Sequence, residues 1–308
     1  MAERVLVTGA AGFIGSNFVR HLLRATDYEV VVVDKLTYAG SRENLPSPEA
    51  TRDYRFVQGD IRDEATVEPE IEDADKVVNF AAQTHVDNSI DDSEPFVLTN
   101  VDGVRSLMDI AAESEVDKYV QISTDEVYGE IAEGAFTEED ALSPRNPYSA
   151  TKAAADHLVE SYYETHGLPA VIARPSNNFG PRQHREKLIP KFIELAAAGE
   201  PLPVYGDGSN VREWTYVYDT CAAIETLLRD GEPGEAYNIG SGNELSNVEV
   251  TEKIIGRTEA SADLIEFVED RPGHDQRYAL DSSKMRSLGW EPEWSFDDGL
   301  AETVDHYL

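Results

Sequence analysis

The sequence predicts an α/β protein: a doubly wound parallel sheet, followed by a smaller α/β domain towards the C-terminus. Short apolar runs rich in β-branched residues recur along the first half of the chain, and amphipathic segments of helical length separate them. This regular alternation breaks down in the second half. Alternating strands and helices favour a parallel sheet with right-handed crossovers. The 308 residues are enough for one large or two modest domains.

The composition is strongly acidic, with 60 acidic and 26 basic residues and a formal net charge of −34. This charge would repel nucleic acid and anionic membranes, so neither is an expected partner. Lys supplies only 8 of the basic residues, against 18 Arg. Acidic surfaces that are poor in lysine are typical of proteins from a salt-saturated cytoplasm, where the charge is screened. We therefore hypothesise a halophilic source.

The remaining composition favours a cytoplasmic protein without a metal site. No apolar run approaches the roughly 18 residues of a membrane span. Residues 1–7 are too short for a signal peptide and run directly into a motif. The single cysteine, Cys221, leaves no disulfide within one chain and no cysteine-based metal site, which fits a reducing compartment.

A glycine-rich turn follows the first apolar run. Residues 4–8 form a short β-rich segment, Gly9, Gly12 and Gly15 come next, and residues 16–24 are amphipathic. Strand, glycine turn and helix in this order are the context of a Rossmann dinucleotide-binding fingerprint. The glycines let the backbone approach a pyrophosphate, which sits at the helix N-terminus. A tight turn without a ligand is the alternative when the glycines are taken alone.

The second apolar run selects the cofactor. Residues 29–33 lead into Asp34, nineteen residues after Gly15. A carboxylate at this position can accept hydrogen bonds from both ribose hydroxyls and would repel a 2′-phosphate. The sequence therefore predicts NAD rather than NADP, although Lys35 would tolerate a phosphate.

Two further strands lead to candidate ligand contacts. The run 54–61 ends in a loop at Asp60 and Ile61 that could border the adenine. The run 76–82 ends in small residues, as a cofactor that lies against the chain requires. His85 follows at the carboxyl end of that strand, where ligands bind in doubly wound sheets, and is either a substrate contact or a structural histidine.

Polar side chains gather where the next strand ends. A helix is expected over residues 96–113 and a strand over 119–122, after which come Thr124, Asp125 and Glu126. The stretch is either an acidic turn or a strand end that delivers a hydroxyl and two carboxylates into a cleft. If both carboxyls work in one site, burial and mutual repulsion should raise one pKa and leave the other group ionised.

Tyr148 and Lys152 are four residues apart at the start of an expected helix over 149–165, so their side chains share one face. The ammonium is expected to lower the pKa of the phenol, which would let Tyr148 act as a base near neutral pH. An ordinary amphipathic helix is the alternative. The pair gains its meaning from the glycine turn and the acid pair that precede it.

The second half offers polar loops and a late strand. Residues 174–181 contain Asn177 and Asn178 and suit either hydrogen bonding to a sugar or a plain turn. The run 236–240 is a late strand that could rejoin the main sheet. Residues 270–278 hold two Arg and a His, which either neutralise a substrate diphosphate or form surface salt bridges.

On these residues the chain resembles the extended short-chain dehydrogenase/reductases that act on nucleotide sugars. The glycine turn, Asp34, Asp60 and the pair of Tyr148 and Lys152 carry that resemblance. Within the superfamily the chain most resembles the dTDP-glucose 4,6-dehydratases, through residues 34–40, 85–87, 123–129, 174–178, 186–190 and 271–275. The likeness covers essentially the whole chain, and the Thr-Asp-Glu triplet is its most specific part.

Two departures from the family pattern leave the sugar and base specificity open. The family usually has Glu-Ser where this chain has Gln83-Thr84, and Phe-Pro where it has His184-Arg185. The resemblance implies a homodimer that packs through helices 96–113 and 149–165. It also implies an NAD-binding Rossmann domain over 1–175, which receives roughly 214–241, and a nucleotide-sugar-binding domain over 176–213 and 242–308.

The resemblance assigns residues to the site. It implies catalytic roles for Thr124, Asp125, Glu126, Tyr148 and Lys152. It implies cofactor contacts from Gly9, Gly12, Phe13, Ile14, Gly15, Asp34, Lys35, Thr37, Asp60, Ile61, Ala81, Ala82, Thr99, Tyr148, Lys152 and Asn177. It implies substrate contacts from His85, Thr124, Asn177, Asn178, Lys187, Leu188, Pro203, Tyr205, Arg212, Asn247, Arg271 and His274.

The implied reaction converts dTDP-glucose to dTDP-4-keto-6-deoxyglucose plus water, in deoxysugar biosynthesis. Tyr148 would remove the C4 hydroxyl proton as hydride passes to NAD, with Thr124 orienting the same oxygen. Glu126 would be the base at C5, and Asp125 the acid that protonates the departing C6 hydroxyl. A nucleotide-sugar 4-epimerase or UDP-glucuronate decarboxylase is the alternative, but would have no use for the acid pair. A non-catalytic NAD-binding regulator is the remote alternative.

Overall fold

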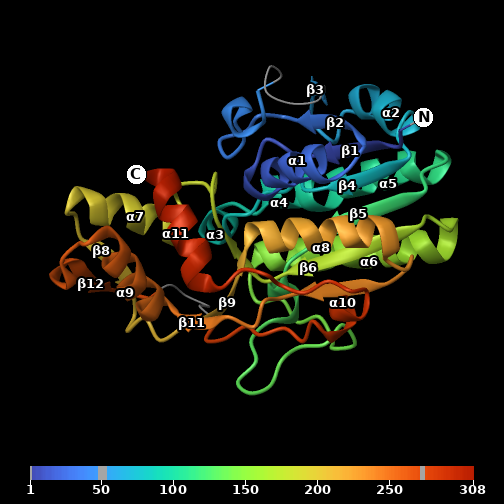
Figure 1. The fold of residues 1–308 in the computed structure, drawn as a ribbon. Coiled ribbons are helices and arrows are strands. Elements are labelled where there is room, and N and C mark those ends of the chain that lie inside the picture. Colours follow the sequence, from blue (N-terminus) through green and yellow to red (C-terminus); the bar gives the residue numbers. More distant parts are fainter. Residues whose placement is uncertain (1, 48–53, 271–274) are drawn as a thin grey trace.

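The computed structural model describes residues 2–47, 54–270 and 275–308, and its main feature is a seven-stranded parallel sheet (Figure 1). The strand order is β10-β6-β5-β4-β1-β2-β3. The strands are β1 (Arg4–Thr8), β2 (Glu29–Asp34), β3 (Tyr54–Gln58), β4 (Lys76–Asn79), β5 (Lys118–Ile122), β6 (Ala170–Pro175) and β10 (Ala236–Ile239). The doubly wound parallel sheet predicted from the alternation of strands and helices is therefore confirmed.

Helices cover both faces of this sheet. On one face lie α1 (Phe13–Ala25) and α8 (Val217–Asp230), and α10 (Ser283–Ser287) adds Met285 to the same core. The opposite face is covered by α2 (Glu64–Glu72), α5 (Val104–Glu113) and α6 (Pro147–His166). Strands buried on both faces read as continuous apolar runs, which is why the sequence 29–33 is uninterrupted valine after Glu29.

The direction of winding reverses between β1 and β4. From β1 the chain winds through β2 to β3, and from β4 it winds the opposite way through β5 and β6. Ligands of open α/β sheets bind at the carboxyl ends of the strands beside this reversal. The glycine turn, the loop after β4 and the acid pair after β5 all lie at that edge.

The chain returns to the main sheet late, because β10 pairs with β6 in parallel, as the sequence 236–240 suggested. The strand before it, β9 (Val211–Tyr216), belongs to a second sheet with β7 (Asn177–Phe179) and β11 (Glu244–Ser246). The return therefore begins with α8 at Val217.

A smaller lobe lies to the left in Figure 1. Its remaining elements are α7 (Leu188–Ala198), β8 (Leu202–Tyr205), α9 (Asn247–Thr258), β12 (Ile265–Val268) and α11 (Phe296–Tyr307). An aromatic cluster of Phe179, Trp214, Tyr216 and Phe296 forms the centre of its core. This lobe stands beside the carboxyl edge of the main sheet.

The helix expected over 96–113 is not a single α-helix. A short α3 (Val86–Asp91) and α4 (Glu94–Phe96) precede a π-helical segment, Val97–Gly103, and only then does α5 begin. The side chain of Asn100, in the π-helical segment, donates to the Gln83 carbonyl at 3.0 Å and accepts from the Gln83 amide at 2.8 Å. Single wide turns of this kind often occur at functional sites.

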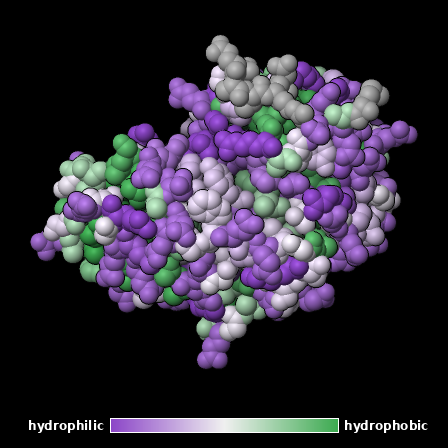
Figure 2. Space-filling model, in the orientation of Figure 1, coloured by the Kyte–Doolittle hydropathy of each residue, from purple (hydrophilic) through white to green (hydrophobic). Residues whose placement is uncertain are grey.

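The surface is mostly hydrophilic on the face shown in Figure 2, as the charge excess requires. Hydrophobic residues gather on the smaller lobe, around α7, β8 and β12, where Phe267 is 57% exposed. No helix within the described residues is long and apolar enough to cross a membrane.

Candidate active site

The glycine turn brings the backbone of β1 against the loop after β4. Gly9 has φ +67°, and a Cβ there would lie 2.4 Å from the Ala81 nitrogen. A Cβ on Gly15 would lie 2.7 Å from the Gly9 carbonyl oxygen. Only glycine fits at these two positions, so the turn packs α1 tightly onto the sheet.

The first turn of α1 has the properties of an anion-binding site. Its N-cap is Gly12, which offers no side-chain oxygen to the free amides, and the first turn contains no acidic residue. Free N–H groups and the positive end of the helix dipole favour a phosphate group there. The residues present therefore fit the pyrophosphate of a dinucleotide.

Asp34 lies at the end of β2 and is held in place by backbone groups. Its Oδ2 accepts from the Ala11 amide at 2.8 Å, and its Oδ1 accepts from the Leu36 amide at 2.7 Å. Burial raises the pKa of Asp34, and the two amides oppose that rise. Each carboxylate oxygen keeps a second lone pair for a ribose hydroxyl, which fits the predicted preference for NAD.

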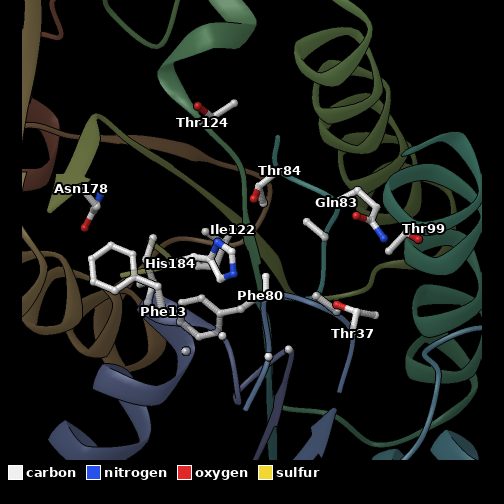
Figure 3. A pocket seen from close by; sticks show the side chains of 18 of the residues that line it. Phe13, Thr37, Phe80, Gln83, Thr84, Thr99, Ile122, Thr124, Asn178 and His184 are labelled. Carbon is white, nitrogen blue, oxygen red and sulfur yellow. The ribbon is translucent and has the colours of Figure 1, made fainter. Parts of the chain in front are cut away.

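A cavity of about 330 Å³ opens at this edge of the sheet (Figure 3). All the residues predicted to contact the cofactor line it: Gly9, Gly12, Phe13, Ile14, Gly15, Asp34, Lys35, Thr37, Asp60, Ile61, Ala81, Ala82, Thr99, Tyr148, Lys152 and Asn177. Figure 3 shows Phe13 on α1, Thr99 on the π-helical segment and Thr124 after β5 around one space. Lys35 pairs with Asp60 at 2.8 Å rather than standing free for a 2′-phosphate.

The predicted catalytic residues line the same cavity. Thr124 caps a short 3-10 helix, Asp125–Tyr128, by accepting a hydrogen bond from the Glu126 amide at 3.3 Å. The Thr124 hydroxyl also donates to Asp125 Oδ1 at 3.1 Å. The second oxygen of Asp125 is buried without a hydrogen-bond partner in the described structure.

The two adjacent carboxyls lie in different environments. Asp125 is 2% exposed, and burial, followed by the charge of Glu126, raises its pKa to about 8. Glu126 is only partly buried and accepts from the Asn146 side chain at 3.2 Å. Asp125 therefore carries a proton at neutral pH, which is the state a general acid needs.

The prediction that Lys152 lowers the pKa of the Tyr148 phenol is wrong for the protein without bound ligands. Burial and the charge of Glu126 raise the pKa of the Tyr148 phenol well above its usual range. Lys152 is itself buried, which lowers its pKa to about 8, and its ammonium donates to the Ile122 carbonyl rather than to the phenol. The sequence spacing placed both residues on one face but did not reveal how deeply that face is buried.

A second cavity, of about 550 Å³, lies between the main sheet and the smaller lobe. It is lined by most of the residues predicted to contact the substrate: His85, Asn177, Asn178, Lys187, Leu188, Pro203, Tyr205, Arg212 and Asn247. Thr124 instead lines the first cavity. Arg271 and His274, also predicted to contact the substrate, lie outside the described residues.

Sequence reasoning missed a polar cluster where the two cavities meet. Glu186 lines both cavities, and its carboxylate lies 3.7 Å from His85 Nε2 and 3.6 Å from His184 Nδ1. Tyr38 lies in the loop that follows β2, and its hydroxyl donates to Glu186 at 3.4 Å. His184 points into the first cavity in Figure 3. The departure from the family pattern at His184-Arg185 was the signal that could have identified this cluster.

Comparison with known proteins shows to which family the chain belongs. A family model described as GDP-mannose 4,6 dehydratase matches residues 6–303. The low-salt glycan biosynthesis protein Agl12 of Haloferax volcanii is 65% identical over 99% of this chain and 98% of its own. A dTDP-glucose 4,6-dehydratase of Streptomyces niveus is 48% identical over 99% of this chain and 92% of its own.

The solved structures agree with the sequence comparison. The crystal structure of DesIV, a dTDP-glucose 4,6-dehydratase from Streptomyces venezuelae with NAD bound, superposes with a TM-score of 0.96. The two sequences are 47% identical, and the match covers 99% of this chain and 96% of DesIV. The similarity therefore extends over both lobes.

Proposed function

The chain belongs to the GDP-mannose 4,6-dehydratase family, and from that premise we propose that it is an NAD-dependent dTDP-glucose 4,6-dehydratase. It converts dTDP-glucose to dTDP-4-keto-6-deoxyglucose and water. The observation that carries this proposal is the pair of adjacent carboxyls, Asp125 and Glu126, in one cavity with Tyr148 and Lys152. Oxidation at C4 requires only the second pair, whereas loss of water also requires an acid and a base.

Tyr148, Thr124 and Lys152 carry out the first half of the reaction, the oxidation at C4. Tyr148 accepts the proton of the C4 hydroxyl as a phenolate, which requires the positive charges of Lys152 and of bound NAD to offset the burial that raises its pKa. The Thr124 hydroxyl orients the same oxygen. Lys152, fixed by the Ile122 carbonyl, supplies a buried positive charge on the same helix face.

NAD held at this site would supply the acceptor for the hydride of C4 and its donor to C6, after which Glu126 returns a proton to C5. The residues that would hold NAD are those of the glycine turn, Asp34 and the loop after β4.

The elimination half belongs to the acid pair. A ketone at C4 acidifies the proton on C5, which Glu126 removes as a carboxylate. Asp125, whose raised pKa keeps it protonated, gives its proton to the departing C6 hydroxyl. Asp125 lines the same cavity as Tyr148 and Lys152, which brings its carboxyl near the same sugar.

The second cavity is the proposed site of the nucleotide and sugar. Asn177, Asn178 and Lys187 line both cavities, and Arg212 and Asn247 lie in the second one. Cationic and amide side chains of this kind suit a diphosphate and a base. We propose that the smaller lobe binds the nucleotide sugar and the main sheet binds NAD.

The function is tested by incubating the purified protein with dTDP-glucose or UDP-glucose at high salt, followed by mass spectrometry. The expected product of dTDP-glucose is lighter by one water and, when formed in heavy water, carries deuterium at C5. A product of unchanged mass would instead indicate a 4-epimerase, and loss of carbon dioxide from UDP-glucuronate would indicate a decarboxylase. Tight NAD binding without turnover of any of these sugars would indicate a regulator.

The raised pKa of Asp125 predicts how the rate of water loss depends on pH. Since that pKa is raised to about 8, Asp125 holds its proton below this pH and loses it above. We expect the rate of water loss to fall about tenfold per pH unit above about pH 8. The measurement is the single-turnover rate at which the product lighter by one water forms from oxidised substrate across that range, with thermal unfolding followed at each pH. A rate that stays constant to about pH 10 would assign the acid to another group.

We also propose that the protein forms a homodimer and is located in the cytoplasm. Large apolar side chains are exposed on the two segments that the resemblance implies for pairing, Val97 and Leu98 within 96–113 and Tyr163 within 149–165. Ile90, on the preceding α3, is exposed as well. Burying them against a second copy would remove this apolar surface from water. Light scattering of the purified protein and of a Leu98→Glu variant tests the pairing.

We also propose that the protein works at high salt, which gives a prediction on stability. The net charge of −34 repels itself over a Debye length of about 30 Å at 0.01 M salt, but of only about 3 Å at 1 M. The midpoint of thermal unfolding should therefore rise by several degrees or more with potassium chloride. Sorbitol is the control, because it strengthens burial without screening charge. Equal unfolding midpoints in dilute buffer and at 1 M salt would contradict the proposal.

A further inference from the structure

One buried guanidinium joins two segments that the reaction needs. Arg174, on β6, is 2% exposed. Its Nε donates to Asp156 Oδ2 at 2.9 Å, and its NH1 group donates to the Tyr128 hydroxyl at 2.7 Å. The charged guanidinium is the donor in both bonds, and the surroundings are buried. A charged donor in a buried environment makes hydrogen bonds strong and directional.

The two partners of Arg174 stand directly behind the catalytic groups. Tyr128 is the last residue of the short 3-10 helix that begins with Asp125 and Glu126. Asp156 lies one helical turn after Lys152 on α6. Arg174 therefore links the segment of the acid pair to the helix that carries Tyr148 and Lys152.

Tyr128 is also fixed from its other side. Its hydroxyl donates to Asn238 Oδ1, on β10, at 2.8 Å. Its ring stacks on Phe136, with centroids 5.0 Å apart and an interplanar angle of 15°. A helix of only four residues has little rigidity of its own. Its orientation therefore depends on the anchor at Tyr128.

Asp156 completes the link from α6. The residue is fully buried, which raises its pKa, and the Ser123 hydroxyl and Arg174 both oppose that rise. Ser123 directly precedes Thr124 and lines the first cavity. Arg174 pairs with Asp156 at 2.9 Å, and the charge of Asp156 also opposes the fall in the Lys152 pKa that burial causes.

We propose that Arg174, together with Tyr128 and Asp156, is a positioning unit that sets the acid pair at the correct distance from Tyr148 and Lys152. One bound substrate molecule can then undergo both C4 oxidation and loss of water without changing its position. The inference rests on the proposed function, because only a dehydratase needs both sets of groups at one sugar. None of the three residues lines either cavity, so they act through the residues that do.

The test is the Tyr128→Phe variant, which keeps the ring on Phe136 and removes only the hydroxyl that joins Arg174 to Asn238. We expect water loss to slow by roughly tenfold, within the about 100-fold that a misplacement of about 1 Å can cost. C4 oxidation should be little affected, because Tyr148 and Lys152 stay on α6. Reduced cofactor should therefore accumulate in a single turnover, and the KM for dTDP-glucose should stay unchanged.

Two further variants complete the experiment. Arg174→Lys keeps a positive charge beside Asp156 but loses the fork that reaches two acceptors, so it should slow the same step more strongly. Tyr119→Phe is the matched control, because Tyr119 is fully buried and its hydroxyl donates to Gln121 on β5. The control should leave both steps unchanged.

Three results separate the positioning unit from the function itself. Wild-type protein that releases no water from dTDP-glucose would overturn the proposed function. Wild-type turnover together with equal slowing of both steps in Tyr128→Phe, or with no slowing of either step, would overturn the positioning role. Selective slowing of water loss, with an unfolding midpoint like that of the Tyr119→Phe control, supports the role.

Discussion

In the Glu126→Gln variant, dTDP-glucose is still oxidised at C4, but water loss slows by about 10²–10⁴-fold, the usual contribution of a general base. The amide cannot accept the C5 proton, whereas Tyr148 and Thr124 remain in place. The expected observations are reduced cofactor that accumulates in a single turnover and a sugar that gains no deuterium at C5 in heavy water. Absorbance of the reduced nicotinamide and mass spectrometry measure the two quantities.

The control for this variant is Glu139→Gln, which removes the same charge from an exposed position beyond the acid pair. It should turn over like the wild type. If Glu126→Gln also releases water at the wild-type rate, the base at C5 is another residue. Asp125 would be the next candidate, but its raised pKa leaves it protonated at neutral pH.

The Tyr148→Phe variant stops the reaction one step earlier. Loss of the phenol oxygen should slow C4 oxidation by about 10²–10⁴-fold, because the phenol is the base assigned to that proton. No reduced cofactor should appear, and neither water loss nor deuterium exchange should follow. Binding of NAD and of dTDP-glucose, measured by calorimetry, should remain close to that of the wild type.

Tyr162→Phe is the control on the same helix, where the Tyr162 hydroxyl donates to Asp109, away from the cavity. The two catalytic variants are distinguishable from each other, because only Glu126→Gln should accumulate reduced cofactor. Reduced cofactor that forms at the wild-type rate in Tyr148→Phe would remove the phenol from the mechanism.

The cofactor end of the site was predictable because local sequence determines it. Gly9 and Gly15 are required by backbone contacts that no other residue could make. Asp34 stands at a fixed spacing from that turn, at the end of a strand that pairs with β1 in register. Short-range geometry of this kind leaves a pattern in the sequence that can be read without the rest of the fold.

The features that the sequence did not reveal depend on distant contacts. The π-helical segment forms where Asn100 fastens to the Gln83 backbone, and the residues around Asn100 read as an ordinary helix. The high pKa of Tyr148 follows from burial and from Glu126, which lies 22 residues earlier in the chain. Glu186 meets Tyr38 and His85 only after both lobes have folded.

The two cavities share part of their lining, and this sharing constrains how such an enzyme can diverge. Six residues line both: Glu126, Asn177, Asn178, Gln183, Glu186 and Lys187. With the proposed assignment of the first cavity to NAD and the second to the sugar, a mutation at any of them would alter both surroundings together, so selection for a new sugar there would also act on cofactor binding. Positions such as Pro203, Tyr205 and Asn247 line the second cavity alone. New substrate preferences should therefore evolve through the smaller lobe, while the shared positions change little.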